Sequence, residues 1–387
     1  MFSRKYHMPC SACHDIVPRL NDVGYKFRRA GFRMPEQIGQ DEVTDFNLGN
    51  YLSAHVALEY SVEHTYDKTA DPAVSRTDNR LALEGVSFHP LTGSFQKHWA
   101  TETEIAFSPN EGVSIENAYV RGAWGGQDLW FQGRVGAFHA IEGFGASDRS
   151  IGVSVPLFMS QGAGLFQDTL FRLVEPSRLG ADVGFQWKNT SLSFFVVNGL
   201  TTVAREGDVT VTGLSAGGAT REEFTMFANQ ILGERSGISA YWAHGSTRPP
   251  VDVAGFGAGT NPLTWRNDFD RVALFGSLGV GSFTGLVGGE LGFDNAREPT
   301  NGTLSRSRSG GAFVEGDFAA SPAVALFTRL DYFDPAAAAT HNTQKGITAG
   351  AAFHQEWLYL IPEMQYRSIL GNDLRTTAFI LHGVAIY

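Results

Sequence analysis

The two cysteines of this chain lie three positions apart, and a histidine directly follows the second: Cys10-Ser11-Ala12-Cys13-His14. This C-x-x-C-H spacing is that of c-type haem attachment, in which two thiols add to the vinyl groups of one haem and the imidazole ligates its iron. A zinc site would need a second ligand cluster, and a redox dithiol would need a βαβ pattern around it. The motif therefore predicts one covalently attached haem c, held by Cys10, Cys13 and His14, with His14 as the proximal iron ligand.

The second axial ligand of this iron has several candidates. Met34 lies 20 positions beyond His14, and a Met/His pair raises the reduction potential of a haem. Met34 is therefore the first candidate, with ordinary packing as its alternative. His55, on the polar face of an expected strand, and His139, at the end of another, stay open as ligands or as polar lining residues.

The segment around the motif is expected to form a small helical haem module, residues 1–43. Asp15 can cap a helix and Pro18 suits its first turn, while Gly31 can end it. An apolar stripe on this helix would lie against the porphyrin: Ile16, Leu20, Val23 and Phe27. The basic residues either face solvent or pair with haem propionates or acidic groups elsewhere: Arg19, Lys26, Arg28, Arg29 and Arg33. So short a module needs both a haem and an enclosing partner to fold.

The composition argues against a nucleic-acid partner. The chain carries 30 Lys and Arg against 40 Asp and Glu, a formal net charge of −10, whereas phosphate binding needs a basic face. Covalent haem attachment takes place outside the cytoplasm, yet residues 1–9 lack the apolar segment of a signal peptide. Either the numbering starts near a mature N-terminus or a signal segment has been left out. The chain has no apolar run of 18 or more residues, so no transmembrane helix is expected.

From about residue 44 the apolar period changes from 3.6 to 2, which predicts β-strands. In 50–63, apolar and polar residues alternate strictly. Sixteen or seventeen strand-like segments follow one another, and bacterial membrane barrels favour even numbers. The expected segments are 50–63, 80–89, 99–107, 113–123, 129–137, 165–174, 183–187, 191–199, 223–232, 236–245, 267–280, 282–293, 309–319, 323–333, 345–354, 358–367 and 376–386. No helix is expected after residue 44.

The connections between these segments are of two kinds. Some are very short, as at 189–190 and 279–281, and others are long, as at 67–79, 201–222, 245–265 and 295–308. Short turns at one end and long loops at the other are typical of outer-membrane barrels. We therefore predict that residues 44–387 form a transmembrane antiparallel β-barrel of about sixteen strands, with the haem module plugging the pore or its periplasmic mouth. A soluble sandwich or propeller is the alternative.

Three stretches of the chain resemble one family, the fused monohaem cytochrome–porins. The first is 2–34, with Lys5-Tyr6, Cys10 to His14, Pro18, Leu20-Asn21, Gly24 and Phe27-Arg28-Arg29; the others are 138–149 and 183–200. The resemblance is close in the haem module and loose in the barrel. It implies an outer-membrane electron carrier that oxidises extracellular Fe(II) and passes electrons to a periplasmic c-type cytochrome or another carrier. Other donors and acceptors stay open.

Two other functions compete with this redox conduit. One is a diffusion porin with a haem plug that either gates the pore or acts as a sensor. The other is a soluble periplasmic haem enzyme on a β scaffold. Four glutamates on polar strand faces bear on the choice: Glu59, Glu63, Glu102 and Glu104. They form either a path that gathers Fe²⁺ or an ordinary charged lining balanced by Arg134, Arg329 and Arg367, and we favour the lining.

Overall fold

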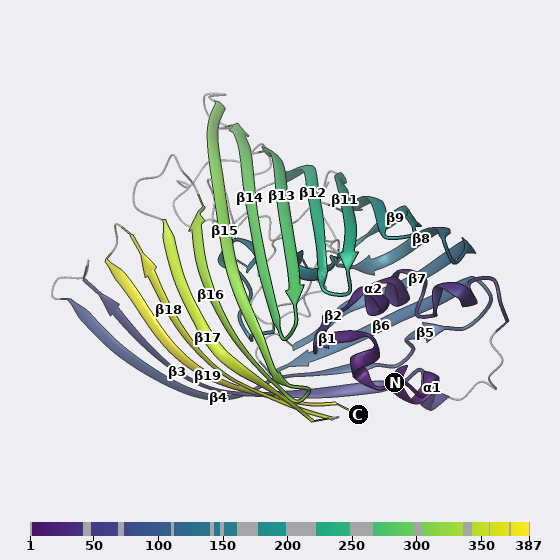
Figure 1. The fold of residues 1–387 in the computed structure, drawn as a ribbon. Coiled ribbons are helices and arrows are strands. Elements are labelled where there is room, and N and C mark those ends of the chain that lie inside the picture. The colour runs from purple at the N-terminus through teal and green to yellow at the C-terminus, as the bar shows by residue number, and fades with distance from the viewer. Residues whose placement is uncertain are drawn as a thin grey trace.

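The fold is described from a computed structural model of the chain. Two short helices and a small hairpin occupy the N-terminal region, and a β-barrel follows (Figure 1). The structure describes residues 2–41, 48–68, 73–109, 112–139, 143–147, 151–160, 177–198, 222–247, 266–297, 304–335, 343–355, 357–370 and 373–386.

The barrel is closed and antiparallel, with every long strand paired to its sequence neighbours. β19 closes it on β3, from Leu374 opposite Asp67 to Ile386 opposite His55. The two-residue β5, Gly93–Ser94, pairs with β6 between β4 and β6. The long strands are β3 Ser53–Asp67, β4 Val74–His89, β6 Trp99–Ser108, β7 Gly112–Gly126, β8 Leu129–Phe138, β9 Arg178–Trp187, β10 Thr190–Asn198, β11 Glu222–Gly233, β12 Ser236–Thr247, β13 Arg266–Val280, β14 Phe283–Arg297, β15 Leu304–Ser321, β16 Val324–Asp334, β17 Gln344–Gln355, β18 Leu358–Ile369 and β19 Leu374–Ile386. Sixteen long strands in the described part of the chain confirm the predicted number; the segment expected at 165–174 lies outside the described residues.

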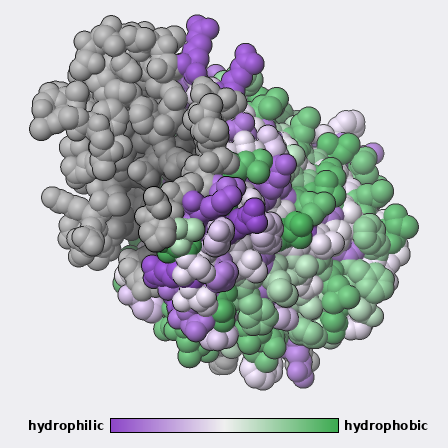
Figure 2. Space-filling model, turned by 90° about the vertical axis from the view of Figure 1, so that its left-hand side faces the viewer, coloured by the Kyte–Doolittle hydropathy of each residue, from purple (hydrophilic) through white to green (hydrophobic). Residues whose placement is uncertain are grey.

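The period-2 pattern of the sequence separates an apolar outer face from a polar inner one. Leu58 and Val135 point outward with 53% and 66% of their surface exposed, while the inward Glu363 is 1% exposed. Hydrophobic residues spread over the described part of the outer wall in Figure 2. An exposed apolar band around a closed barrel is stable in lipid rather than in water. Among the described helices, none has the length and apolar character that a membrane-crossing helix needs.

Short turns close one end of the barrel as predicted, and the long connections predicted at 201–222 and 245–265 lie mostly outside the described residues. Tight turns join β9 to β10 and β13 to β14, and both chain termini lie at this turn end (Figure 1). The predicted loops at 67–79 and 295–308 are wrong, because β4 begins at Val74 and β15 at Leu304. The first half of β4 has both faces exposed. This part of β4 therefore carries no period-2 signal. At the start of β15 the two faces do differ, but buried Ser307 and Ser309 alternate with exposed arginines, so no apolar alternation marks the strand.

The N-terminal module consists of α1 Phe2–Tyr6, the 3₁₀ turn η1 Cys10–Ala12, the hairpin of β1 His14–Ile16 and β2 Arg19–Leu20, α2 Asp22–Arg29 and the 3₁₀ turn η2 Pro35–Gln37. The predicted helix start near Asp15 is wrong. The segment from His14 to Leu20 turns back on itself as a hairpin, and α2 begins only after Asn21, whose side chain accepts the Gly24 amide. The Asn21 cap competes successfully with Asp15 because it satisfies an amide of the first turn. Gly31, at φ 78°, follows the helix end as predicted.

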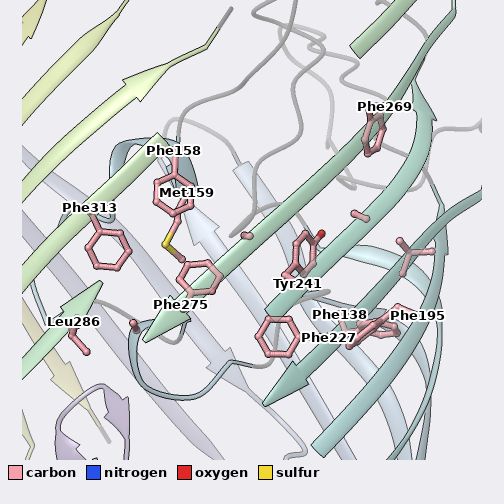
Figure 3. Packing of buried hydrophobic residues seen from close by; sticks show 14 of the residues in the cluster. Phe138, Phe158, Met159, Phe195, Phe227, Tyr241, Phe269, Phe275, Leu286 and Phe313 are labelled. Carbon is pink, nitrogen blue, oxygen red and sulfur yellow. The ribbon is translucent and has the colours of Figure 1, made fainter. Parts of the chain in front are cut away.

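The connection between β8 and β9 contributes two short segments that pack against the inside of the wall: η4 Gly145–Ser147 and α3 Leu157–Ser160. The expectation of no helix after residue 44 is thus wrong. Phe158 and Met159 of α3 belong to a buried aromatic cluster with inward rings of the strands (Figure 3). Its members are Tyr119, Phe138, Ala146, Phe158, Met159, Phe195, Val197, Phe227, Tyr241, Ala243, Phe269, Ala273, Phe275, Leu286, Phe313 and Phe333.

One network of buried charges holds the module to the wall. Arg19 donates to Asp317 of β15 at 2.7 Å and lies 4.0 Å from Glu315. Glu315 in turn lies 3.4 Å from Arg329 of β16, which donates to the Ser154 carbonyl at 2.8 Å. We call this chain of residues the Arg19 network. It joins the module, two strands and the segment that precedes α3.

Replacing Arg19 with Met is expected to destabilise the protein by about 3–5 kcal/mol, because Asp317 stays buried without its cation, whereas Glu315 keeps Arg329. Urea unfolding in lipid vesicles, followed by tryptophan fluorescence, measures the change. Lys68→Met is the control: its pair with Asp373 is 63% and 56% exposed, so its loss should cost at most about 1 kcal/mol. Equal midpoints for the two variants would contradict a structural role of the network.

Candidate functional site

The cysteines of the C-x-x-C-H motif lie on one short 3₁₀ turn. The Cys13 amide donates to the Cys10 carbonyl at 3.1 Å, which closes η1. Both thiols are half-buried and free of disulfide bonds. Burial raises the pKa of the Cys13 thiol, and the neighbouring Cys10 raises it further. The Cys13 thiol is therefore uncharged at neutral pH.

The His14 ring is oriented by the turn that follows it. Nδ1 lies 3.1 Å from the carbonyl oxygen of Pro18. A carbonyl oxygen only accepts, so Nδ1 carries the proton and the lone pair of the neutral imidazole is on Nε2. Metal-ligating histidines are held in this way, with the second nitrogen donating to a backbone carbonyl or carboxylate. The residues of the motif thus fit the donor set that a c-type haem requires.

Helix α2 packs directly on the backbone of the motif, through Gly24. A Cβ added at Gly24 would lie 2.0 Å from the Cys13 carbonyl oxygen and 2.9 Å from Leu20. The backbone amide of Asn21 donates to the Cys13 carbonyl oxygen at 3.0 Å. The absence of a side chain at Gly24 is therefore what allows the helix to support the turn that carries Cys13 and His14.

The inside of the barrel surrounds this segment. Ile16 packs on a buried apolar group of Phe327, Ala352 and Ile361. From α2, Tyr25 hydrogen-bonds Ser191 at 2.8 Å, and Arg29 donates to Ser193 at 3.0 Å. These partners come from strands on different sides of the barrel, so residues 2–41 sit within its turn end.

The predicted apolar stripe and basic face of the module take different roles from those expected. Val23 is 38% exposed, while Phe27 packs on Phe2, Tyr6 and Phe32. The basic residues were expected either to face solvent or to pair with acidic groups. Arg19 pairs with Asp317, and Arg29 donates to Ser193 of the wall. Arg33 donates to the carbonyls of Gln96, Lys97 and Trp99. Lys26 donates to Asn189 and Arg28 to the Gly143 carbonyl.

The three candidates for the distal position lie in different places. Met34 precedes η2 and packs on the cluster of Phe27, Phe32 and Ala100. His55 lies on β3, with its ring centroid 5.7 Å from that of His89. His139 follows β8, and its Nε2 is 3.4 Å from the Ser177 hydroxyl. Ligation by Met34 stays a prediction, and ordinary packing accounts for its contacts in the described structure.

The four predicted glutamates do not form one path. Glu59 lies 3.8 Å from His382 of β19, and Glu63 is exposed. The three arginines expected to balance them separate as well. Arg134 pairs with Asp182, and Arg329 pairs with Glu315 and Asp331. Arg367 interacts electrostatically with Glu63.

Glu102 and Glu104, by contrast, converge with His89 of β4. One ligand atom of each of these three side chains lies within 4.8 Å of the others. Sequence reasoning missed His89, because only the β4–β6 pairing brings it to the glutamates.

The comparisons with solved structures show the fold of bacterial porins. An anion-selective porin from Comamonas acidovorans matches with a TM-score of 0.56 at 10% identity, over 87% of this chain and 99% of that one. OmpT of Vibrio cholerae, an outer-membrane protein, matches in a loop L8 deletion mutant with a TM-score of 0.52 at 12% identity, over 87% and 99%. The trimer form of in-vitro folded OmpT gives 0.51 at 12% identity, again over 87% and 99%.

Sequence comparison adds no family. No family model and no curated protein matches the chain. At 10–12% identity, the structural likeness establishes the porin-type barrel and nothing about the N-terminal module.

Replacing Gly24 with Ala is expected to displace α2 from the Cys13 turn and to cost about 1–3 kcal/mol, as overpacking of a tight contact does. The rate of trypsin cleavage within α2, after Lys26 or Arg28, measures the loosening. Gly126→Ala is the control, because a Cβ there meets nothing within 4 Å. The tight contact would be refuted if both variants resisted trypsin as well as the unchanged protein does.

Proposed function

We propose that this protein is an outer-membrane electron conduit: a porin-type barrel whose lumen holds a covalently attached haem c on residues 1–41. Cys10 and Cys13 would form the thioethers and His14 would ligate the iron from Nε2. The haem supplies one-electron redox chemistry when bound. The chain's own residues hold that group: α2 supports the turn, Pro18 orients the imidazole, and the Arg19 network fixes the module to the wall.

The observation that carries this proposal is the packing of the module and of an aromatic cluster against the inner wall of the barrel. The rings of Phe138, Phe195 and Phe227 face inward, yet they are 0%, 2% and 1% exposed. Side chains that line a water-filled pore are exposed to it. An aromatic cluster packed on the inner wall, together with a module at the turn end, narrows the lumen and supports the passage of electrons over that of solutes.

The proposal has a simple physical basis. The apolar band of a membrane barrel is about 25 Å tall, and electron tunnelling falls steeply with distance. A redox centre held inside the barrel divides that span into shorter steps. The proposed donor is extracellular Fe²⁺ and the proposed acceptor is a periplasmic cytochrome or another carrier; both rest on the resemblance to the cytochrome–porins.

A second candidate function is that of a diffusion porin whose haem plug gates the pore or acts as a sensor. The porin-type fold favours it, since the comparisons include an anion-selective porin. The two functions differ in one property, the conductance of the barrel for ions.

Covalent haem attachment is tested by denaturing the purified protein, extracting it with acidic acetone and recording the pyridine haemochrome spectrum. The unchanged chain should retain haem, and a Cys10→Ala, Cys13→Ala double variant should lose it. Ser11→Ala, between the two thiols, should retain haem because the spacing of the motif is unchanged. Complete extraction of haem from the unchanged protein would overturn the proposal.

Electron transfer is tested by anaerobic mixing of the oxidised protein with Fe²⁺, watching the haem absorption bands for reduction. Ion conductance in planar bilayers separates the two candidate functions. The conduit predicts haem reduction and a nearly closed pore. Open, steady conductance with no reduction of the haem would favour the diffusion porin instead.

A further inference from the structure

A histidine and two glutamates meet on the inner face of the barrel wall, where β4 pairs with β6. The ligand atoms of His89, Glu102 and Glu104 all lie within 4.8 Å of one another. The closest approach between the histidine and a carboxylate is 3.6 Å, from His89 Nε2 to Glu104 Oε1. We infer that these three side chains form a binding site for a divalent transition-metal cation.

Each carboxylate is held in place by a donor from β7. Asn117 Nδ2 donates to Oε2 of Glu104 at 2.9 Å, and the Tyr119 hydroxyl donates to Oε2 of Glu102. Outer hydrogen bonds of this kind orient the ligands of metal sites and tune their affinity. Glu104 is only 6% exposed, so its charge is desolvated and gains strongly from a bound cation.

Several inward carboxylates pair with an arginine. Asp182 pairs with Arg134, Glu223 with Arg178, and Asp294 with Arg271. At Glu104 the corresponding partner is His89, a side chain that is a metal ligand in its neutral form. One neutral imidazole and two carboxylates carry a charge of −2, which a divalent cation neutralises.

The donor set points to a class of metal. Mixed imidazole and carboxylate ligands suit Fe²⁺, Mn²⁺, Co²⁺ and Zn²⁺, whereas Ca²⁺ prefers oxygen alone and Cu⁺ prefers sulfur. A second histidine is near, since the His55 ring centroid lies 5.7 Å from that of His89. His55 also lines a cavity of about 440 Å³, together with Ser87 and Ala106.

The site is built from barrel residues alone, so metal binding does not depend on the haem. Mn²⁺ is the suitable probe, because it favours the same ligands as Fe²⁺ and is paramagnetic, and a c-type haem does not oxidise it.

The experiment is equilibrium dialysis of the full-length protein in detergent against Mn²⁺, with metal counted by mass spectrometry and the bound ion followed by electron paramagnetic resonance. We expect one Mn²⁺ per chain, and an affinity lower by about ten-fold or more in His89→Asn and Glu104→Gln. Glu102→Gln is expected to weaken binding to a similar extent. Because Glu102 is only half-buried, this variant tests the site even if the variant of the buried Glu104 does not fold.

A matched control is available on the outer face of the barrel. His244 Nδ1 lies 3.1 Å from Asp270 Oδ1, and both side chains are exposed. His244→Asn should bind Mn²⁺ as the unchanged protein does, and so should the Cys10→Ala, Cys13→Ala double variant. The inference is overturned if millimolar Mn²⁺ leaves the protein metal-free, or if His89→Asn and Glu102→Gln bind with unchanged affinity. Binding in the cysteine variant separates failure of the haem proposal from failure of this one.

Discussion

The buried charges around Arg19 hold the interior of this barrel together. A guanidinium at 2% exposure faces Asp317 and Glu315, and Arg329 continues the chain of charges to Ser154. Once desolvated, such groups are stable only while every partner is in place. The module, two strands and the inserted segment therefore fix one another, and the turn that carries Cys13 and His14 is positioned as part of the barrel rather than as a free domain.

This arrangement explains how so short a module can be ordered. The aromatic core of residues 2–41 is completed by the barrel: Tyr25 packs on Phe144 and Ile231, and the rings of Phe2, Tyr6, Phe27 and Phe32 pack with Ala100. In each case the barrel supplies part of the apolar surface. Closure of the turn end by the module and packing of α3 in the aromatic cluster leave a lumen suited to holding groups in fixed positions. A haem and a bound cation are both groups of that kind.

Local patterns predicted the parts of the fold that obey a local rule. The alternation at 50–63 predicted β3, and Gly31 marked the end of α2. Prediction failed where the decisive partner is distant in sequence. Asp15 was expected to cap a helix, but Asn21 caps α2 and the intervening residues form a hairpin against the wall. The first half of β4 was taken for a loop because water meets both of its faces. The start of β15 was taken for one because buried serines alternate there with arginines rather than with apolar residues.

By itself, the sequence determined the barrel and its strand number, because strand period is written along the chain, and the C-x-x-C-H spacing supplied the residues of the proposed haem attachment. Only the tertiary structure decided what lies inside the barrel. The Pro18 carbonyl beside His14, the ion pair of Arg19 and Asp317, and the meeting of His89 with Glu102 and Glu104 all depend on pairing or docking in three dimensions. A closed barrel brings its first and last strands, and everything enclosed between them, into contacts that no local pattern encodes.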